Sequence, residues 1–213
     1  MHKFIPLFPL QMVVFPGENL NLHIFEPRYR QLISVCESED ITFGIPAYID
    51  GKLSKLGTEI RLSAIEKRYP GGEMDIRTVA GGIFQVNRFY RQVPGKLYPG
   101  ADIEQLEIDF NEDEVVNEQI LELTRDLFEV LGIQKKLPET AENFLTYQIG
   151  HHVGFSVEQE YELLTLRNAI ERQEHMLLHL ERVVPMAKEM ENLRKRAQMN
   201  GHFKNIPPLD LNL

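Results

Sequence analysis

The sequence predicts an α+β protein in which a β-rich region precedes a helical one. Apolar residues alternate with polar ones in short runs up to about residue 110 and recur at helical spacing after it. Turn-forming residues follow the same division, because 10 of the 14 glycines and 8 of the 12 prolines lie before residue 111. We therefore expect a coiled sheet or pseudo-barrel with one short inserted helix, followed by a helical bundle that ends in a long kinked helix.

Four segments of the first region alternate between apolar and polar residues, and we expect strands there: 20–24, 60–64, 74–76 and 106–110. Pro70-Gly71-Gly72 separates two such runs and predicts a hairpin turn. Gly81-Gly82 indicates a bulge or a close backbone approach within a strand. Pro27 is suited to the first position of a helix that continues to about Glu37. This helix would have one apolar face: Tyr29, Leu32, Ile33 and Cys36.

Helices are expected throughout the second region. Asn111 and Glu114 fit a capping box that opens the first helix, and Gly132 would end it. A second helix is expected between 138 and 150. Ser156 and Gln159 fit another capping box, which opens the third helix.

The fourth helix is expected from about 168 to 201, with a kink at Pro185 because proline removes a backbone donor. Its length makes it a candidate surface for homo-oligomerisation. Its expected apolar face includes Ile170, Leu177, Leu180, Val184, Ala187 and Met190.

Composition and charge limit the possible functions. The chain has 213 residues, of which 43% are hydrophobic and 26% charged, a composition typical of a globular protein. The formal net charge is −9, −2 before residue 111 and −7 after it, which makes nucleic-acid partners unfavourable. We place a domain boundary at this shift, giving domains 1–110 and 111–199 and a tail, 200–213.

The N-terminal residues and the cysteine content predict a cytoplasmic protein. No apolar run approaches the ~18 residues that cross a bilayer, and the first residues lack the apolar core of a signal peptide. Cys36 is the single cysteine, so neither an intrachain disulfide nor a cysteine-based zinc site can form. We expect no membrane partner.

The sequence contains no recognisable catalytic motif. It has neither a Gly-x-Ser-x-Gly elbow nor a phosphate-binding loop. His175 and His179, four residues apart, supply two imidazoles, fewer than the three or four protein ligands of a zinc site, and a polar helix face is the favoured alternative. We expect no catalytic residue, no cofactor and no metal.

Aromatic residues are concentrated in the first region, which holds 13 of the 19 phenylalanines and tyrosines. Four lie in apolar runs and are expected in the core: Phe15, Phe25, Phe43 and Phe84. Tyr69, beside the hairpin turn, and Phe89 and Tyr90, at a strand end, are candidates for binding apolar peptide segments. The alternative is that these three side chains cover the ends of the core.

Two segments near the N-terminus resemble the N-terminal, substrate-binding domain of Lon proteases. The first, from Pro6 to Gly17, ends in Phe15-Pro16-Gly17, and the second runs from Leu22 to Arg30. Phe43-Gly44-Ile45 and the segment 56–60 then follow in the family's order. The resemblance covers about residues 4–198. Its motif residues are expected to be structural: Phe15, Pro16, Gly17, His23, Phe25, Glu26, Pro27, Arg28 and Tyr29.

The resemblance implies a PUA-like β-domain followed by a helical bundle. It also implies a role, because in Lon this region engages unfolded or tagged substrate proteins, whereas later domains carry the ATPase and the Ser-Lys protease. No segment here matches those domains, so we expect a stand-alone, non-catalytic module that binds unfolded or tagged protein segments, with a protease as a further candidate partner. The alternative is RNA binding, which the PUA-like topology and the interleaved Arg88, Phe89, Tyr90 and Arg91 suggest.

Overall fold

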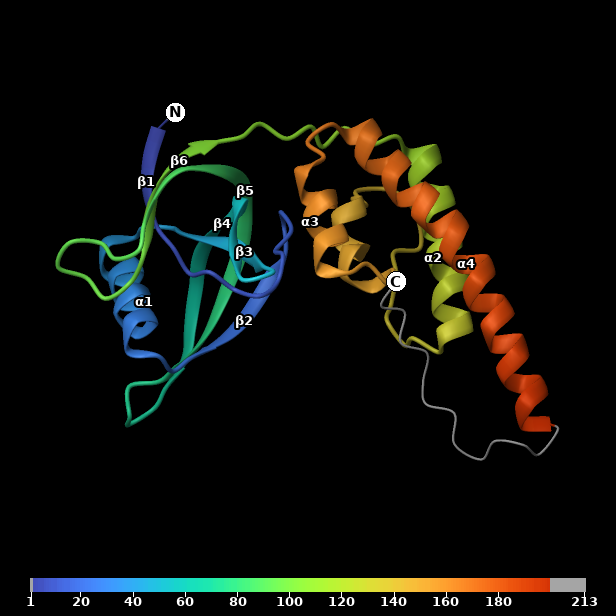
Figure 1. The fold of residues 1–213 in the computed structure, drawn as a ribbon, viewed down its shortest axis with the longest axis horizontal. Helices are drawn as coiled ribbons and strands as arrows, with labels where there is room; N and C mark the ends of the chain where they lie inside the picture. The colour runs from blue at the N-terminus through green and yellow to red at the C-terminus, as the bar shows by residue number, and fades with distance from the viewer. Residues whose placement is uncertain (1, 200–213) are drawn as a thin grey trace. The chain divides into compact units, whose positions relative to one another are not determined.

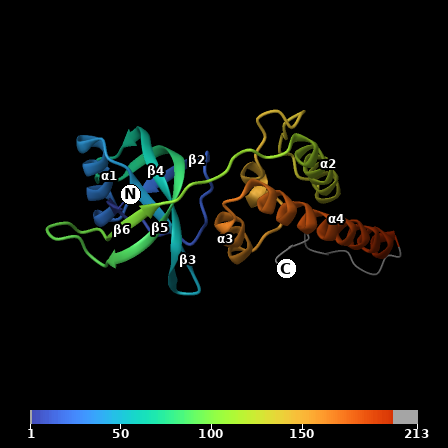
Figure 2. The same ribbon diagram turned by 90° about the horizontal axis from the view of Figure 1, so that it is seen from above.

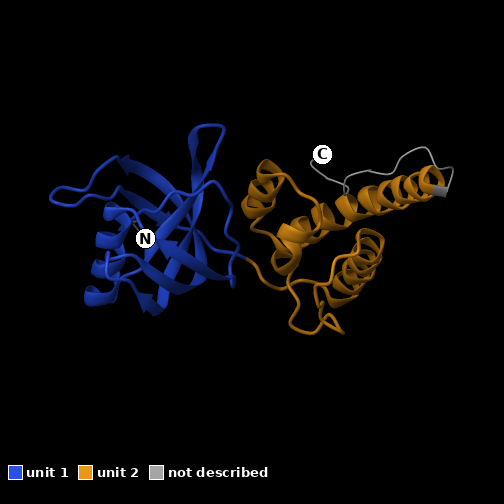
Figure 3. Cartoon of the chain, turned by 90° about the horizontal axis from the view of Figure 1, so that it is seen from below, with its two compact units in different colours: residues 1–108 blue, residues 109–213 orange. Residues whose placement is uncertain are grey.

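The computed structural model describes residues 2–199 and shows an α+β fold (Figure 1). Its elements are, in order, β1 (His2–Pro6), β2 (Asn19–Ile24), α1 (Pro27–Glu39), β3 (Phe43–Ile49), β4 (Lys52–Arg68), β5 (Met74–Tyr90), β6 (Gly100–Gln105), α2 (Glu114–Leu131), the 3-10 helix η1 (Thr146–His152), α3 (Val157–Thr165) and α4 (Ala169–Met199). The chain divides into two compact units, residues 1–108 and 109–213 (Figure 3). We refer to them as the β-rich unit and the helical unit.

An antiparallel sheet forms the β-rich unit, with the strand order β1-β6-β5-β4-β3. The long strand β5 has β4 along one side, and along the other it pairs first with β2 and then with β6. Gly81 and Gly82 lie where the partner changes. Ala80 of β5 pairs with Ile60 of β4, and Ile83 pairs with Thr58. β5 therefore advances three residues over a stretch in which β4 advances two. The predicted bulge is therefore confirmed.

The two ends of the strand path meet without closing the sheet. Beyond β1, Leu7 and Leu10 form isolated parallel bridges with Gly44 and Ala47 of β3. The Phe8 N–H also donates to the Gly44 carbonyl at 2.8 Å. These contacts coil the sheet into the expected pseudo-barrel, which α1 covers on one side (Figures 1 and 2).

The inserted helix α1 forms as the sequence predicts. Pro27 is its first residue, and the Glu26 carbonyl accepts hydrogen bonds from the N–H groups of Tyr29 and Arg30, each at 3.0 Å. The helix ends at Asp40, whose φ of 50° is left-handed. Its predicted face is buried against the sheet: Tyr29, Leu32, Ile33 and Cys36.

Three of the four phenylalanines expected in the core are buried: Phe15, Phe43 and Phe84. The prediction for Phe25 is wrong, because 62% of this residue is exposed. Side chains alternate between the two faces of a strand, and Ile24, the last residue of β2, is buried. Phe25 follows it directly and therefore lies on the outer face.

The ends of the helices in the second unit are set by side-chain caps. Asp113, rather than the predicted Asn111, caps α2, and its Oδ1 accepts from the N–H groups of Val115 at 2.8 Å and Val116 at 3.1 Å. Gly132 ends α2 with a φ of 69°, as predicted. The capping box of Ser156 and Gln159 at the start of α3 is also confirmed.

Two predicted elements are absent from the described chain, in each case because tertiary contacts take the backbone groups. Residues 106–110 form no strand: the Leu106 N–H donates to Ile83 O, but the Asp109 N–H donates to Arg167 O, both at 2.9 Å. The helix expected over 138–150 is replaced by a loop and by η1. The Thr146 N–H, at the start of η1, donates to a carboxylate oxygen of Glu112 at 2.9 Å.

The long last helix α4 begins after Asn168, whose Oδ1 accepts from the N–H of Ile170 at 2.9 Å, and it continues on both sides of Pro185. The bend expected at this proline stays a prediction. The buried face differs in part from the predicted one, because Ile170 and Met190 are exposed. Residues 200–213 lie outside the described part. Apolar side chains on the buried face are Ala169, Met176, Leu180, Val183, Val184 and Ala187.

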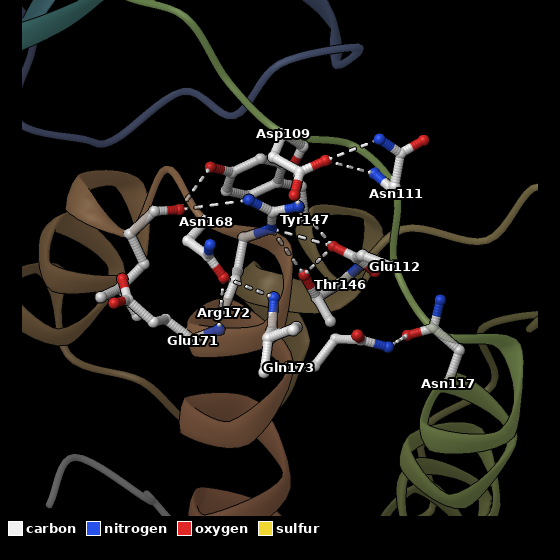
Figure 4. A network of polar contacts seen from close by, with 12 residues as sticks. Asp109, Asn111, Glu112, Asn117, Thr146, Tyr147, Asn168, Glu171, Arg172 and Gln173 are labelled. Atoms are coloured by element: carbon white, nitrogen blue, oxygen red, sulfur yellow. Dashed lines mark hydrogen bonds and ion pairs between the residues drawn. The ribbon is translucent and has the colours of Figure 1, made fainter.

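A buried ion pair joins four segments of the helical unit (Figure 4). Arg172 of α4 is fully buried, and its Nη2 lies 2.8 Å from Oε1 of Glu112. The same guanidinium donates to the carbonyls of Asp109 at 2.8 Å and Leu166 at 3.2 Å. Glu112 also accepts from the Thr146 hydroxyl at 2.8 Å. Both charges are thus hydrogen-bonded as well as paired, which a buried ion pair requires.

We expect Gly57→Ala to lower the free energy of unfolding by about 1–3 kcal/mol, the usual effect of overpacking a core. A Cβ at this position would lie 2.6 Å from the Phe84 ring and 2.9 Å from the Ile45 carbonyl. Urea unfolding followed by circular dichroism measures the change. Gly71→Ala is the control, because the nearest atoms there belong to the flexible Glu73 side chain. Equal stability of the two variants would contradict the expectation.

We expect Arg172→Met to destabilise the helical unit by about 3–5 kcal/mol, because it leaves the Glu112 carboxylate buried without a partner. Calorimetric unfolding of the full chain measures this loss. Adding Glu112→Leu should recover part of it, since no buried charge then remains. The control is Lys188→Met, which removes an exposed ion pair with Asp126 and should cost about 0–1 kcal/mol. Similar losses for both single variants would show that the buried pair has no special role.

Candidate functional site

The three aromatic residues proposed to bind peptide do not form one site. Tyr69 precedes the hairpin turn that leads into β5, whereas Phe89 and Tyr90 are the last two residues of the same strand. The 17-residue strand β5 therefore separates them. Each of the two places gathers further aromatic side chains, so the β-rich unit carries two candidate surfaces.

The first surface, which we call the hairpin cluster, consists of His23, Phe25, Tyr69 and Asp75. Strand pairing places His23 opposite Asp75, and their Nδ1 and Oδ1 atoms lie 2.7 Å apart. The Tyr69 hydroxyl donates to the other oxygen of Asp75, also at 2.7 Å. The His23 ring lies 6.1 Å from the Phe25 ring and 5.8 Å from the Tyr69 ring, measured between centroids. One carboxylate thus orients two rings beside the exposed Phe25.

The electrostatics of the hairpin cluster follow from these contacts. The hydrogen bonds from His23 and then Tyr69 hold the pKa of Asp75 below its usual range, because they stabilise the charged carboxylate. The Lys67 ammonium lies 4.4 Å from the centre of the Tyr69 ring, within cation–π distance. The cluster therefore combines apolar ring surface with a fixed carboxylate near the surface of the protein.

The other residues of the family motif serve mainly to position the chain. Phe15 is buried, and Gly17, with a φ of 82°, turns the chain so that its N–H donates to Ala80 O at 3.0 Å. Arg28 pairs with Glu26 at 2.8 Å. Tyr29 stacks on Phe8 with 3.9 Å between ring centres. His23 and Phe25 differ from these residues because they lie exposed beside Tyr69.

The second surface is a groove bounded by β1, the end of α1 and the loop between β5 and β6. Its volume is about 500 Å³. Lys3, Glu39 and Lys96 contribute charges of both signs to its lining. Its apolar lining is Phe4, Pro6, Val35, Ile41, Val93 and Tyr98.

The groove connects with the aromatic end of β5 through Phe4. This side chain is 46% exposed, and its ring centre lies 6.2 Å from that of Tyr90. Gly100 permits the arrangement, because a Cβ there would lie 2.5 Å from the Phe4 ring. The Tyr90 hydroxyl donates to Asp102 at 2.7 Å, and Phe89 is 43% exposed. Phe4 was not among the residues predicted from the sequence, although it lies in an apolar run of the first strand.

His179 and Cys36, two residues with ligand-binding or catalytic chemistry, are both buried. His179 is buried, its Nε2 lies 2.8 Å from the Val153 carbonyl, and burial lowers its pKa. Burial raises the pKa of Cys36 to about 12, so its thiol is protonated at neutral pH. Over residues 2–199, no three histidine, cysteine or acidic side chains come together in a way that could hold a metal ion. No helix in that range is both long and apolar enough to cross a membrane.

Fold and sequence together define a class of substrate-binding domain. A sequence model described as the ATP-dependent protease La (LON) substrate-binding domain matches residues 5–182. The chain therefore belongs to the Lon substrate-binding domain family. Comparison with curated proteins gives no match.

Solved structures of two proteins share the fold. One is a Lon N-terminal domain protein from Xanthomonas campestris, with a TM-score of 0.64 and 23% identity, over 83% of this chain and 98% of that one. The other is the N-terminal domain of Mycobacterium avium complex Lon protease, with a TM-score of 0.61 and 13% identity, over 84% of this chain and 98% of that one. At these identities the likeness shows the fold alone, a mixed sheet-and-helix architecture ending in a long helix.

We expect the Asp75 carboxyl to titrate below the ordinary aspartate range and to move back toward it in His23→Ala and in Tyr69→Phe. Because folding lowers this pKa, the stabilisation from these hydrogen bonds is present above the pKa of the unfolded chain and is lost as pH falls through the folded value. Carbon-13 NMR of the carboxyl groups measures the titration. An unchanged Asp75 midpoint in both variants would contradict the network.

Proposed function

We propose that this chain is a non-catalytic module that captures exposed apolar segments of unfolded or tagged proteins, with the groove as its binding site. The observation that carries the proposal is the groove itself, about 500 Å³ in volume, lined largely by apolar side chains and bordered by the exposed Phe4. Membership of the Lon substrate-binding domain family supports it. Proteolysis would then belong to a partner protease.

The size of the groove suits side chains of a peptide. Binding pockets commonly enclose roughly 300–1,000 Å³, so this one can accept one or two large apolar side chains. Fully burying such a side chain contributes about 1.5–3 kcal/mol. Burial of two such side chains would give weak, reversible binding. The bound segments would need to be hydrophobic but would not need a particular sequence.

The charges around the groove favour binding that depends little on salt. Lys3 is paired with Glu59 at 2.6 Å, and Glu39 and Asp40 offset Lys96. A lining with both signs creates no strong field of one sign, so screening by salt has little to weaken. The residues of the groove therefore favour apolar protein segments over nucleic acid.

RNA binding is the second candidate function, and one contact favours it. The guanidinium of Arg88 lies 5.1 Å from the centre of the Tyr90 ring, a basic and aromatic pair of the kind that single-strand binders use. The net charge of −9 opposes it.

We also propose that the protein is cytoplasmic. We further propose that the protein forms homo-oligomers through α4. The helix exposes apolar side chains that a second copy could cover: Leu178, Met186, Met190 and Leu193.

We expect Phe4→Ala to weaken binding of a fluorescein-labelled unfolded polypeptide at least tenfold, because truncation of an aromatic hot-spot residue costs about 2 kcal/mol or more. Fluorescence anisotropy with reduced, carboxymethylated lactalbumin measures the affinity at two salt concentrations. Tyr48→Ala is the matched control, since Tyr48 is 40% exposed and does not line the groove.

Two results would contradict the proposed function. One is equal affinity of the two variants and the unaltered protein for the polypeptide. The other is no polypeptide binding together with tight, strongly salt-dependent binding of a labelled single-stranded RNA, which would favour the second candidate.

A further inference from the structure

Strand β2 has one uncovered edge. Within residues 2–199 its only strand neighbour is β5, which pairs with all six of its residues. The opposite edge therefore presents backbone N–H and C=O groups that pair with no described strand. Unpaired edge groups of this kind are a template for an added strand.

The other edges of the sheet have neighbours of different kinds. β1 and β3 end the strand path, and the bridges from Leu7 and Leu10 bring them together. The second half of β4 extends beyond β3 and runs beside α1, where Arg68 pairs with Glu37 at 2.5 Å. Residues 61–65 of β4 line a cavity of about 310 Å³ together with residues of α1, so this edge faces a helix, whereas the open edge of β2 has no strand beside it among residues 2–199, where β5 is its only strand neighbour.

β2 also lacks the devices that commonly protect an open edge. Its sequence, from Asn19 to Ile24, contains no lysine and no proline. Its register with β5 is regular, without a bulge, whereas the ladders of β5 with β4 and with β6 both contain register shifts. Lysine, proline and bulges are the usual means of preventing strand addition, so this edge is suited to accept a partner.

Side chains on both faces of β2 offer apolar contacts to an added strand. On the inner face, Leu22 is half-buried at the margin of the core, and a neighbouring strand would complete its burial. On the outer face, His23 and Phe25 continue toward Tyr69 in the hairpin cluster. An added strand could therefore bury apolar side chains on both of its faces near this end of β2.

We propose that an extended segment of a client polypeptide adds to the open edge of β2 as a further strand and packs an apolar side chain against Phe25. The proposal rests on the proposed function and gives it a second binding site with a stated conformation. Backbone hydrogen bonds supply affinity that does not depend on the sequence of the client, and the hairpin cluster selects apolar or aromatic side chains.

An extended client fits this edge better than a second copy of the chain. Only a strand satisfies a row of backbone donors and acceptors, which excludes a helix as the occupant. A second β2 would bring another molecule with a net charge of −9, and like charges oppose association. Unfolded segments with alternating apolar residues carry no such cost.

The test uses a fluorescein-labelled peptide of about nine residues, in which valine and threonine alternate around a central phenylalanine. Two analogues carry N-methyl groups on one or the other set of alternate residues, so that each blocks one edge of the peptide. We expect one analogue to bind the full-length protein at least about tenfold more weakly than the other. Amide hydrogen exchange should show new protection in β2 when the unmethylated peptide is bound.

Protein variants separate this site from the groove. Phe25→Ser should weaken peptide binding about tenfold, whereas Tyr48→Ser, a matched exposed aromatic, should leave it unchanged. Phe4→Ala should weaken it less than Phe25→Ser does. Circular dichroism checks that each variant is folded.

Four results would overturn the proposal. Equal binding of the two methylated analogues would exclude strand addition. Loss of peptide binding in Phe4→Ala but not in Phe25→Ser would assign the peptide to the groove and leave the proposed function standing. Protection of β2 without peptide, together with a dimer in sedimentation velocity, would assign the edge to a second copy. If neither this peptide nor the unfolded polypeptide bound, the proposed function would fail as well.

Discussion

The helical unit depends on one buried charge. Arg172 has no exposed surface, so each of its donors needs a partner within the protein. Those partners come from segments far apart in the chain: the linker at Asp109 and Glu112, η1 at Thr146, and the end of α3 at Leu166. The long loop between α2 and η1 can therefore be irregular, because its far end is fixed by this charge rather than by regular backbone pairing.

The distance along the chain between contacting residues explains which features the sequence could and could not predict. Local signals were sufficient for α1, for the cap of α3 and for the bulge at Gly81-Gly82, since each depends on residues that are neighbours in the chain. They failed at 106–110 and at 138–150, where the backbone hydrogen bonds go to Arg167 and Glu112 instead.

The candidate sites show a related limit. Tyr69, Phe89 and Tyr90 were chosen for their places beside turns and strand ends, but their neighbours come from strand pairing. His23 meets Tyr69 because β2 pairs with β5, and Phe4 meets Tyr90 across β6. Alternation along β2 contained enough information to place Phe25 outside the core once Ile24 was placed inside. The groove had no such signal, since its lining comes from three separate parts of the chain.

On the proposed function, the protein must expose apolar surface without associating with itself, and the arrangement of the β-rich unit suits both needs. Its aromatic side chains are divided between two ends of β5 instead of forming one large patch, which lowers the tendency to aggregate. At each end of β5 a carboxylate accepts a hydrogen bond from a tyrosine hydroxyl, Asp75 from Tyr69 and Asp102 from Tyr90. These hydrogen bonds orient the rings in advance, so that less conformational freedom is lost when a client binds. The net negative charge also opposes self-association, because two copies of the protein repel each other, whereas an uncharged apolar segment is not repelled.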